Sequence, residues 1–336
     1  MKPTIRIVFR TFIVALCLAG NGVSPAVAQT AVTSCGQTVA DDGVLAADLD
    51  CSAAPLGVAL SEGAGLDLNG RRLQGLVQCT ADCRIDGPGQ IEGKIEAETL
   101  DLSNATVQDG QGIQATTVTI AGSQILRNSG GVVCRNCSVD SSEISDNGLG
   151  IQCIQRTYTV GGGHREAGKL EMTNSIVRNN GAYGVRCARA AVIDGSEISG
   201  HVTGIEVWGS SYQPKPSGSY FGKAFVSNST ISGNSDYGVF AWGRAELLNC
   251  NVLANGRGVG GVRHGARIES SSVLDSASYG AEGKRVTLID SVVSGSGTGN
   301  PSASDLYSTM RPRVDEGSSC GTSDGPNGDW NVCSMD

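Results

Sequence analysis

Two charged residues in the middle of the chain are of the types that catalysis on a sugar requires. Glu206 can act as a general acid or base, and Arg186 can stabilise a developing negative charge. Hydrolysis of a glycosidic bond needs two carboxyl groups roughly 5–9.5 Å apart, and β-elimination needs a base with positive charge at the sugar carboxylate. If the two residues are neighbours in space, however, a surface ion pair explains both without catalysis. Catalytic roles for Glu206 and Arg186 are therefore a hypothesis, and both a lyase and a hydrolase stay open.

The aromatic residues are few, and several lie close to Glu206 in the sequence. The chain of 336 residues has only 3 Trp, 7 Tyr and 5 Phe. Exposed rings suit the apolar faces of sugars, which points to polysaccharide binding, whereas packing beneath a loop is the alternative for the tryptophans. The candidate binding residues are Trp208, Trp242, Tyr183, Tyr237, Phe240, His164 and Arg189.

A repeat determines where these residues lie. A glycine followed by an apolar residue recurs with a modal spacing of 19 residues, as in Gly131-Val132 and Gly150-Ile151. A fixed period indicates stacked, similar units. The first apolar positions of the units are Ile125, Ile144, Ile176, Ile198, Ile231, Val252, Val273 and Val293. Three residues after them stand Asn128, Asn147, Asn179, His201, Asn234, Asn255 and Ser276. Stacked amides can hydrogen-bond along such a column, and His201 there is expected to be a turn residue rather than a base.

Each unit is expected to form one coil of three short strands. Runs such as Val118-Thr119-Ile120 alternate with a period of two and are rich in β-branched residues. Strands rise roughly 3.3 Å per residue and turns take two to five residues, so three strands fit in each unit. The sequence predicts an all-β, single-stranded parallel β-helix of about ten coils, and not a leucine-rich repeat. The residues two positions after the repeat glycines should then point outward: Gln152, Arg186, Glu206, Phe240, Arg263 and Glu282.

These repeats, with the opening segment Gly65-Leu66-Asp67-Leu68-Asn69-Gly70, resemble the right-handed parallel β-helix superfamily of secreted proteins that includes the pectate lyases. The resemblance covers about residues 35–298 and implies a right-handed helix with capped ends. The superfamily contains lyases, hydrolases, epimerases and adhesins, so the fold alone implies no reaction. The motifs of its polygalacturonases, pectate lyases and mannuronan epimerases are not found in this sequence. A non-catalytic structural or adhesive envelope protein is therefore the alternative to a polysaccharide-binding protein.

Two intervals of 34 residues interrupt the repeat and indicate insertions at about residues 155–169 and 209–223. Both leave the repeat after the same strand, so they should emerge on one side, two coils apart. Long loops on a rigid scaffold are common binding sites, although insertions without a role fit equally well. The expected organisation is a signal peptide over 1–28, an N-terminal cap and opening strands over 29–70, the β-helix over 71–298, and a C-terminal cap or tail over 299–336.

The first 28 residues have the pattern of a secretory signal. Lys2, Arg6 and Arg10 flank an apolar run, and Ala26-Val27-Ala28 is a small-residue cleavage site. We expect a periplasmic or secreted protein without a membrane span. The formal net charge of −8 argues against nucleic acid as a partner. The expected partner is a polysaccharide or cell-envelope glycan, no cofactor is expected, and the sequence does not define the oligomeric state.

Cysteines follow the signal in an odd number, since 11 of the 12 lie after Cys17. Three close pairs are proposed as disulfides: Cys35 with Cys51, Cys79 with Cys83, and Cys320 with Cys333. The pairing of Cys134, Cys137, Cys153, Cys187 and Cys250 stays open. Three of these five follow repeat glycines and should stack in consecutive coils. A buried column or a disulfide is expected there, and no metal, because the cysteines do not form two Cys-x-x-Cys pairs.

Overall fold

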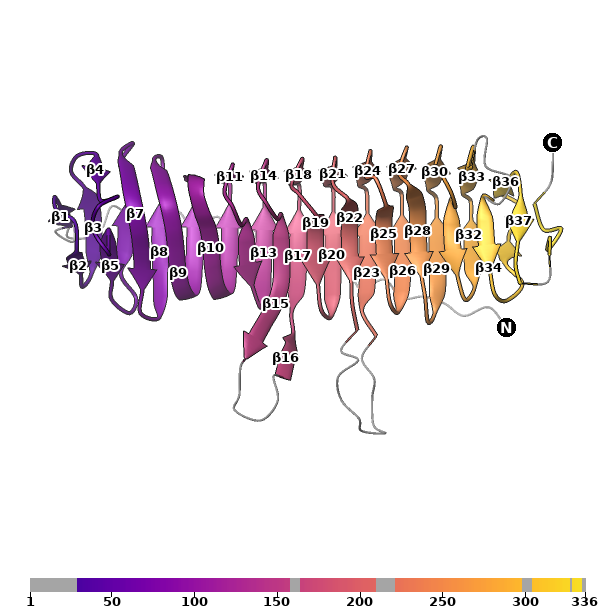
Figure 1. Cartoon of the computed structure of the whole chain (residues 1–336), viewed down its shortest axis with the longest axis horizontal. Helices are drawn as coiled ribbons and strands as arrows, with labels where there is room; N and C mark the ends of the chain where they lie inside the picture. The colour runs from indigo at the N-terminus through magenta and orange to yellow at the C-terminus, as the bar shows by residue number, and fades with distance from the viewer. Residues whose placement is uncertain (1–28, 158–163, 210–220, 298–303, 327, 334–336) are drawn as a thin grey trace, which may run out of the picture.

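The computed structural model describes residues 29–157, 164–209, 221–297, 304–326 and 328–333, and the signal predicted for 1–28 lies outside them. All regular structure in this part of the chain is β-strand, from β1 (Thr30–Val32) to β37 (Ser323–Asp324). The strands wind into one long, straight solenoid of about 13 turns (Figure 1). No helix that could cross a membrane occurs in the described residues.

Three rows of parallel strands run along the solenoid, and each coil contributes one strand to each row. The first row is β12 (Val132–Cys134), β15 (Ile151–Thr157), β19 (Tyr183–Cys187), β22 (Thr203–Val207), β25 (Tyr237–Ala241), β28 (Arg257–Gly261), β31 (Ala281–Gly283) and β34 (Leu306–Ser308). The second is β13 (Asn136–Asp140), β17 (Lys169–Thr173), β20 (Ala190–Asp194), β23 (Lys223–Ser227), β26 (Arg244–Leu248), β29 (Gly265–Glu269) and β32 (Val286–Ile289). The third is β11 (Gln124–Leu126), β14 (Glu143–Ser145), β18 (Ile176–Arg178), β21 (Glu197–Ser199), β24 (Thr230–Ser232), β27 (Asn251–Leu253), β30 (Ser272–Leu274) and β33 (Val292–Ser294).

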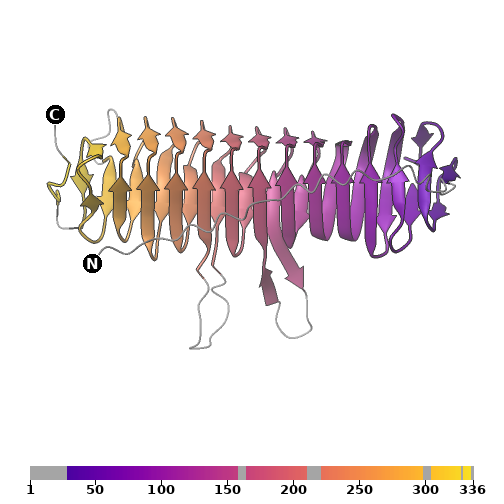
Figure 2. The same cartoon turned by 180° about the vertical axis from the view of Figure 1, so that it is seen from behind.

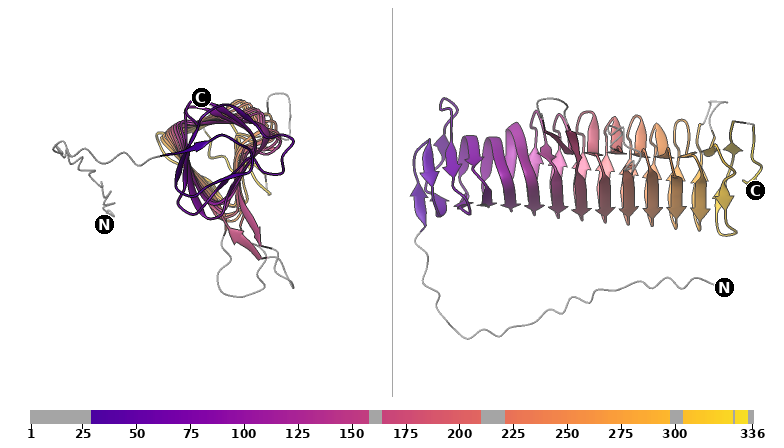
Figure 3. Two further views of the ribbon diagram at one scale, coloured as in Figure 1. Left: turned by 90° about the vertical axis from the view of Figure 1, so that its left-hand side faces the viewer. Right: turned by 90° about the horizontal axis from the view of Figure 1, so that it is seen from below.

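Every strand of a row pairs in parallel with its equivalents in the coils before and after it, as in Ile205 of β22 with Val185 and Val239. The rows are continuous on the opposite side of the molecule as well (Figure 2). Seen along its axis, the stack forms a closed tube (Figure 3). The predicted all-β parallel fold is confirmed.

The number of coils is higher than the predicted ten because parallel pairing extends further toward both ends. Near the start, β1 already pairs in parallel with β3 (Asp42–Leu45), with Thr30 beside Gly43. Near the other end, β34 pairs with β37. Both regions have irregular spacing in the sequence, so the repeat does not reveal them.

The interior of the tube is filled by columns of like side chains. Val185, Ile205, Val239 and Val259 stack in the first row and are almost completely buried. Burial of such a side chain contributes roughly 1.5–3 kcal/mol, so the stacked columns are the main stabilising feature of the coils.

A column of buried asparagines runs beside the apolar core. The side-chain amide of Asn128 donates to Asn147 Oδ1 at 3.1 Å, and the Asn147 amide donates to Asn180 Oδ1 at 2.9 Å. His201 occupies the next position. Its Nδ1 accepts the backbone N–H of Asn180 at 3.1 Å, and its own backbone N–H donates to Asn234 Oδ1 at 3.0 Å. The predicted column therefore exists, and His201 is a buried member of it.

In one unit, the predicted column was assigned one residue too early. Ile176 is 37% exposed, whereas Val177 is completely buried and pairs with Ile144 and Ile198. The ladder residue is likewise Asn180, because Asn179 has a left-handed backbone with φ 52°. Ile176 and Val177 are both β-branched, and each is followed three residues later by an asparagine, so the sequence pattern fits either register.

A second ladder, which the sequence analysis missed, consists of buried serines. The backbone N–H of Ser142 donates to Ser175 Oγ at 3.1 Å, and that of Ser175 donates to Ser196 Oγ at 3.2 Å. Cys250 takes a serine position in this ladder, and its backbone N–H donates to Ser271 Oγ at 2.9 Å. Both ladders satisfy backbone donors at the corners of the coils, where no strand partner is available.

The cysteines fall into disulfides and buried thiols. Disulfides join the three proposed pairs, Cys35 with Cys51, Cys79 with Cys83, and Cys320 with Cys333, and a fourth joins Cys134 with Cys137. Cys153, Cys187 and Cys250 are buried thiols. Two of the disulfides lie in the terminal coils, where unpaired strand edges most need support.

Candidate functional site

The outer surface of the first strand row carries the polar and aromatic residues that the sequence analysis selected. Arg186 in β19 lies beside Glu206 in β22, and Glu206 lies beside Phe240 in β25. The next outward position is Gly260, not Arg263 as predicted. The repeat glycine of this coil is Gly258. The sequence analysis used Gly261, in the nearby pair Gly260-Gly261, and so assigned the wrong register.

Arg186 is the centre of the first cluster on this surface. Its guanidinium carbon lies 4.4 Å from the ring centroid of Tyr183 and 4.7 Å from that of Trp208. Its Nε lies 3.0 Å from Glu206 Oε2, in an ion pair whose side chains are only 24% and 13% exposed. The guanidinium is thus held between two aromatic rings and a carboxylate, an arrangement in which cation–π attraction contributes on the order of 1 kcal/mol or more.

Two buried polar atoms of this cluster, Arg186 Nε and Glu206 Oε2, lack a hydrogen bond of good geometry within the described part of the chain. The indole N–H of Trp208 faces the Glu206 carboxyl. Arg186 Nε and Glu206 Oε2 are close enough for an ion pair, but the contact lacks the geometry of a hydrogen bond. Burial raises the pKa of Glu206, although the indole of Trp208 and the charge of Arg186 lower it. Polar atoms left without partners in a native structure often have a ligand or water as their partner. Arg186 and Glu206 therefore form an ion pair with spare hydrogen-bonding capacity.

A row of aromatic rings continues from Trp208 along the surface. Trp208 and Trp242 follow β22 and β25, and their ring centroids are 6.4 Å apart. Phe240 lies 6.3 Å from Trp242 and 4.7 Å from Tyr237. Trp242 is 41% exposed. The row presents apolar ring surface over two consecutive coils, which is suited to the faces of sugar rings.

A hollow of about 200 Å³, which the sequence analysis missed, lies beyond Phe240. The outward position between Phe240 and Glu282 is occupied by Gly260, where a Cβ would lie 2.8 Å from the Tyr237 ring and 3.1 Å from the Phe240 ring. The hollow is lined by Phe240, Gly261, Val262, Glu282, Gly283, Lys284, Tyr307 and Thr309. A run of three glycines within four residues, Gly258 to Gly261, was the signal in the sequence that could have indicated it.

Tyr237 connects the aromatic row to a second polar cluster at the hollow. Its hydroxyl donates a hydrogen bond to Glu282 and accepts one from Arg257 Nη1 at 2.6 Å. Arg257 Nη1 is also 3.7 Å from Glu282 Oε1. Burial, the hydrogen bond to Glu282 and its charge raise the pKa of Tyr237, so the phenol is protonated across the ordinary pH range.

The predicted insertions leave the solenoid at the edge between the first and second rows. The first begins as an antiparallel hairpin of β15 and β16 (His164–Ala167) that projects from the stack (Figure 1). His164 begins β16, and its side chain lies outside the described residues. Most of the second insertion, residues 210–220, also lies outside them. Phe221, where the described chain resumes, contacts His264 edge-on with ring centroids 5.3 Å apart.

Arg189 is exposed at the same edge, in the turn before β20, and several other exposed residues of this edge are also positively charged. Lys223 and Arg244 are register partners at the start of β23 and β26. The exposed cations of this edge are Arg189, Lys223, Arg244, Arg263 and Lys284. A protein with an overall negative charge thus carries a line of cationic side chains beside its aromatic row, one of which, Arg244, is paired with Glu246 at 3.1 Å.

One comparison with known protein families agrees with this architecture. A family described as "Right handed beta helix region" matches residues 83–221. Among solved structures, the chain is similar to the crystal structure of Dettilon tailspike protein (gp208), with 11% sequence identity and a TM-score of 0.32. The similarity covers 82% of this chain and 57% of that chain, so this protein spans little more than half of the tailspike length. No curated protein sequence matches significantly.

Proposed function

The chain belongs to the right-handed parallel β-helix proteins, and we propose that it binds a polysaccharide along the outer surface of its first strand row. The observation that carries the proposal is the continuous row from Tyr183 to Phe240, in which aromatic rings lie beside an ion pair with spare hydrogen-bonding capacity, Arg186 with Glu206. Sugars offer apolar faces and hydroxyl rims, which such a surface matches. The fold itself supports many functions and adds no argument of its own.

The hollow beside Phe240 supports binding of a chain rather than of a single sugar. The Arg186 cluster and the hollow lie on the same surface, with Trp208, Trp242 and Phe240 between them. Successive coils are roughly 4.8 Å apart, so the surface from β19 to β31 extends over about 20 Å. This length accommodates several sugar units laid along the solenoid axis.

The line of exposed cations at the edge favours an acidic polysaccharide. Arg189, Lys223, Arg244 and Arg263 lie along the border of the aromatic row. Positive charge beside a binding surface raises the local concentration of an anionic polymer and speeds its association. We therefore expect uronate-containing or phosphate-containing glycans to bind better than neutral ones, and increasing salt to weaken that preference.

Cleavage of the bound polymer is a separate question, for which Glu206 is the candidate acid. Its buried carboxyl has a raised pKa, which favours the protonated form that a general acid requires. The adjacent Arg186 also suits a purely structural pairing. Replacement of Glu206 by Gln keeps the shape and removes the acid, so it distinguishes loss of turnover from loss of binding.

We also propose that the protein is exported. Four disulfides in the described residues are expected in an oxidising compartment, and residues 1–28 have the signal-peptide pattern. N-terminal sequencing of protein from the periplasm or medium should find a chain that begins at Gln29. A chain retained in the cytoplasm with its first 28 residues intact would contradict this proposal.

A glycan array with acidic and neutral polysaccharides tests the proposed function. We expect selective retention of at least one acidic polymer, reduced at high salt. Absorbance of unsaturated uronates and analysis of reducing ends then show whether the retained polymer is also cleaved. If no polysaccharide is retained at any salt concentration, the proposal is wrong and the protein has the structural or adhesive role named as the alternative.

A further inference from the structure

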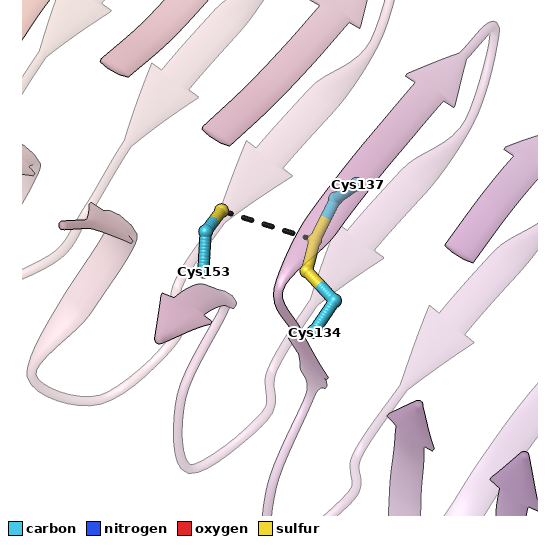
Figure 4. Close-up of side chains that lie close together, drawn as sticks. All are labelled: Cys134, Cys137 and Cys153. Atoms are coloured by element: carbon cyan, nitrogen blue, oxygen red, sulfur yellow. Dashed lines mark hydrogen bonds between the residues drawn. A yellow bond between two sulfur atoms is a disulfide. The ribbon is translucent and has the colours of Figure 1, made fainter. Parts of the chain in front are cut away.

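Three cysteine sulfurs meet inside the solenoid at the corner between β12 and β13 (Figure 4). Cys134 ends β12, and Cys137 lies in β13 with two residues between the two cysteines. Cys153 in β15, in the next coil, pairs with Cys134. All three Sγ atoms lie within 4.8 Å of one another, and those of Cys137 and Cys153 are 3.8 Å apart. The three side chains are at least 96% buried. Two consecutive coils therefore bring three sulfurs to one enclosed point.

This arrangement has the dimensions of a thiolate metal site. Cys134 and Cys137 have the Cys-x-x-Cys spacing of many zinc sites. Sulfur ligands about 2.3 Å from an ion lie about 3.8–4.0 Å from one another, which is the separation of Cys137 and Cys153. Thiolates select soft ions such as Zn²⁺ and Cu⁺ over hard ones. We infer that, when Cys134 and Cys137 are reduced, these two residues and Cys153 bind one soft metal ion.

Packing alone does not require cysteine at these positions. In the column of Cys134 and Cys153, the following coils have Cys187, then Val207 and Ala241. In the column of Cys137, the flanking residues are Val118 and Leu170. Ordinary aliphatic side chains thus fill the same positions elsewhere in the tube. Cys187 is completely buried next to Cys153 and places a fourth thiol beside the three.

The redox state of Cys134 and Cys137 would control the site. In the structure they form a disulfide, which removes two of the three ligands. A dithiol or phosphine reductant supplies two electrons, the S–S bond breaks, two protons are taken up, and the reductant is oxidised. Metal binding then displaces the thiol protons.

The test uses the whole chain produced and purified in a non-chelating phosphine reductant, with Zn²⁺ in one arm and Cu⁺ in the other. Metal content per chain is measured by mass spectrometry. We expect one ion per chain in one arm, which also identifies the metal. In Cys153→Val, whose new side chain already occurs in this column at Val207, we expect affinity to fall roughly tenfold or more. Cys250→Ser is the control. Cys250 lies outside the cluster, and serine occupies the neighbouring positions of its ladder, so this variant should retain the ion.

If the reduced wild-type protein binds no metal in either arm, the Cys134–Cys137 pair is a structural disulfide only, and the inference is overturned. Equal metal content in wild type and Cys153→Val would also overturn it. Cys137→Leu, which matches Leu170 in the next coil, provides a second variant if Cys153→Val does not fold. Re-oxidation, followed by mass mapping of the Cys134–Cys137 disulfide, should release the ion.

Discussion

The phenol of Tyr237 in β25 donates a hydrogen bond to the carboxylate of Glu282 in β31, past Gly260 in the strand between them, β28. A side chain at position 260 would meet the rings of Tyr237 and Phe240 at 2.8 Å and 3.1 Å. The positions of the two rings, and with them the contact to Glu282, therefore depend on this glycine. The interior of the solenoid is therefore regular, whereas the shape of its outer surface depends on which outward positions are occupied by glycine.

Gly260→Val should displace both rings and fill the hollow without unfolding the coil, because the atoms it meets are the ends of side chains and not backbone. We expect polysaccharide affinity to fall by roughly 1 kcal/mol or more, the scale of an aromatic contact. Affinity electrophoresis and the melting temperature together measure this. Thr287→Val, on the second row, is the matched control. Equal affinity of Gly260→Val and wild type would exclude the hollow from the binding surface.

Val177→Asp should destabilise the protein by about 3 kcal/mol or more, because it buries an unpaired charge in an apolar column. Ile176→Asp, one residue away, should change the free energy of unfolding by less than about 1 kcal/mol, since Ile176 is 37% exposed. Urea denaturation measures both. The register described for β18 is wrong if Ile176→Asp proves the more damaging substitution.

His201 should make stability depend on pH. Burial lowers its pKa from 6.5 in the folded protein, so the unfolded chain takes up a proton at higher pH than the folded one. The stability from His201 is then fully present above about pH 6.5 and is lost as pH falls below it, by about 1.4 kcal/mol per unit of pKa shift. The hydrogen bonds from Asn180 to Nδ1 and from Nε2 to the Val177 carbonyl fit the neutral ring.

His201→Asn tests this pH dependence, because asparagine occupies both neighbouring positions of the ladder, Asn180 and Asn234. Denaturation curves from about pH 7.5 to about pH 5 should show a smaller slope of stability against pH in the variant than in the wild type. Identical slopes in the two proteins would mean that other groups cause the pH dependence.

Loss of the terminal disulfides should loosen the ends before the middle. Cross-links such as Cys320–Cys333, with a sequence separation of 13, contribute about 2–4 kcal/mol. In Cys320→Ser/Cys333→Ser, hydrogen exchange should accelerate in β36 (Ser319–Cys320) and β37 while β19 keeps its protection. Uniform acceleration along the solenoid would instead indicate that the coils unfold as one cooperative unit.

The fold could be predicted because its information is periodic. A residue type that recurs once per coil fixes strand rows, inward columns and the neighbours of Arg186 and Glu206 without knowledge of the whole structure. Prediction failed where two adjacent residues fitted the same role, as with Ile176 and Val177. It also failed where a glycine left an outward position empty, because Gly260 and the hollow depend on ring positions in neighbouring coils. The sulfur cluster was only partly foreseen, since the corner that brings Cys137 to Cys153 is not visible in the spacing.

Titration calorimetry of the Trp208→Ala/Trp242→Ala protein, with a polymer that the wild-type protein retains, shows whether the aromatic row binds polysaccharide. Each substitution should weaken binding by roughly 1–2 kcal/mol while the circular dichroism stays native, because Trp242 is exposed and Trp208 is half-buried, outside the apolar core. Val192→Ala, which removes an apolar residue that is 45% exposed on the second row, should bind as the wild type does. Unchanged affinity in the double tryptophan variant would contradict the account and place the binding site elsewhere.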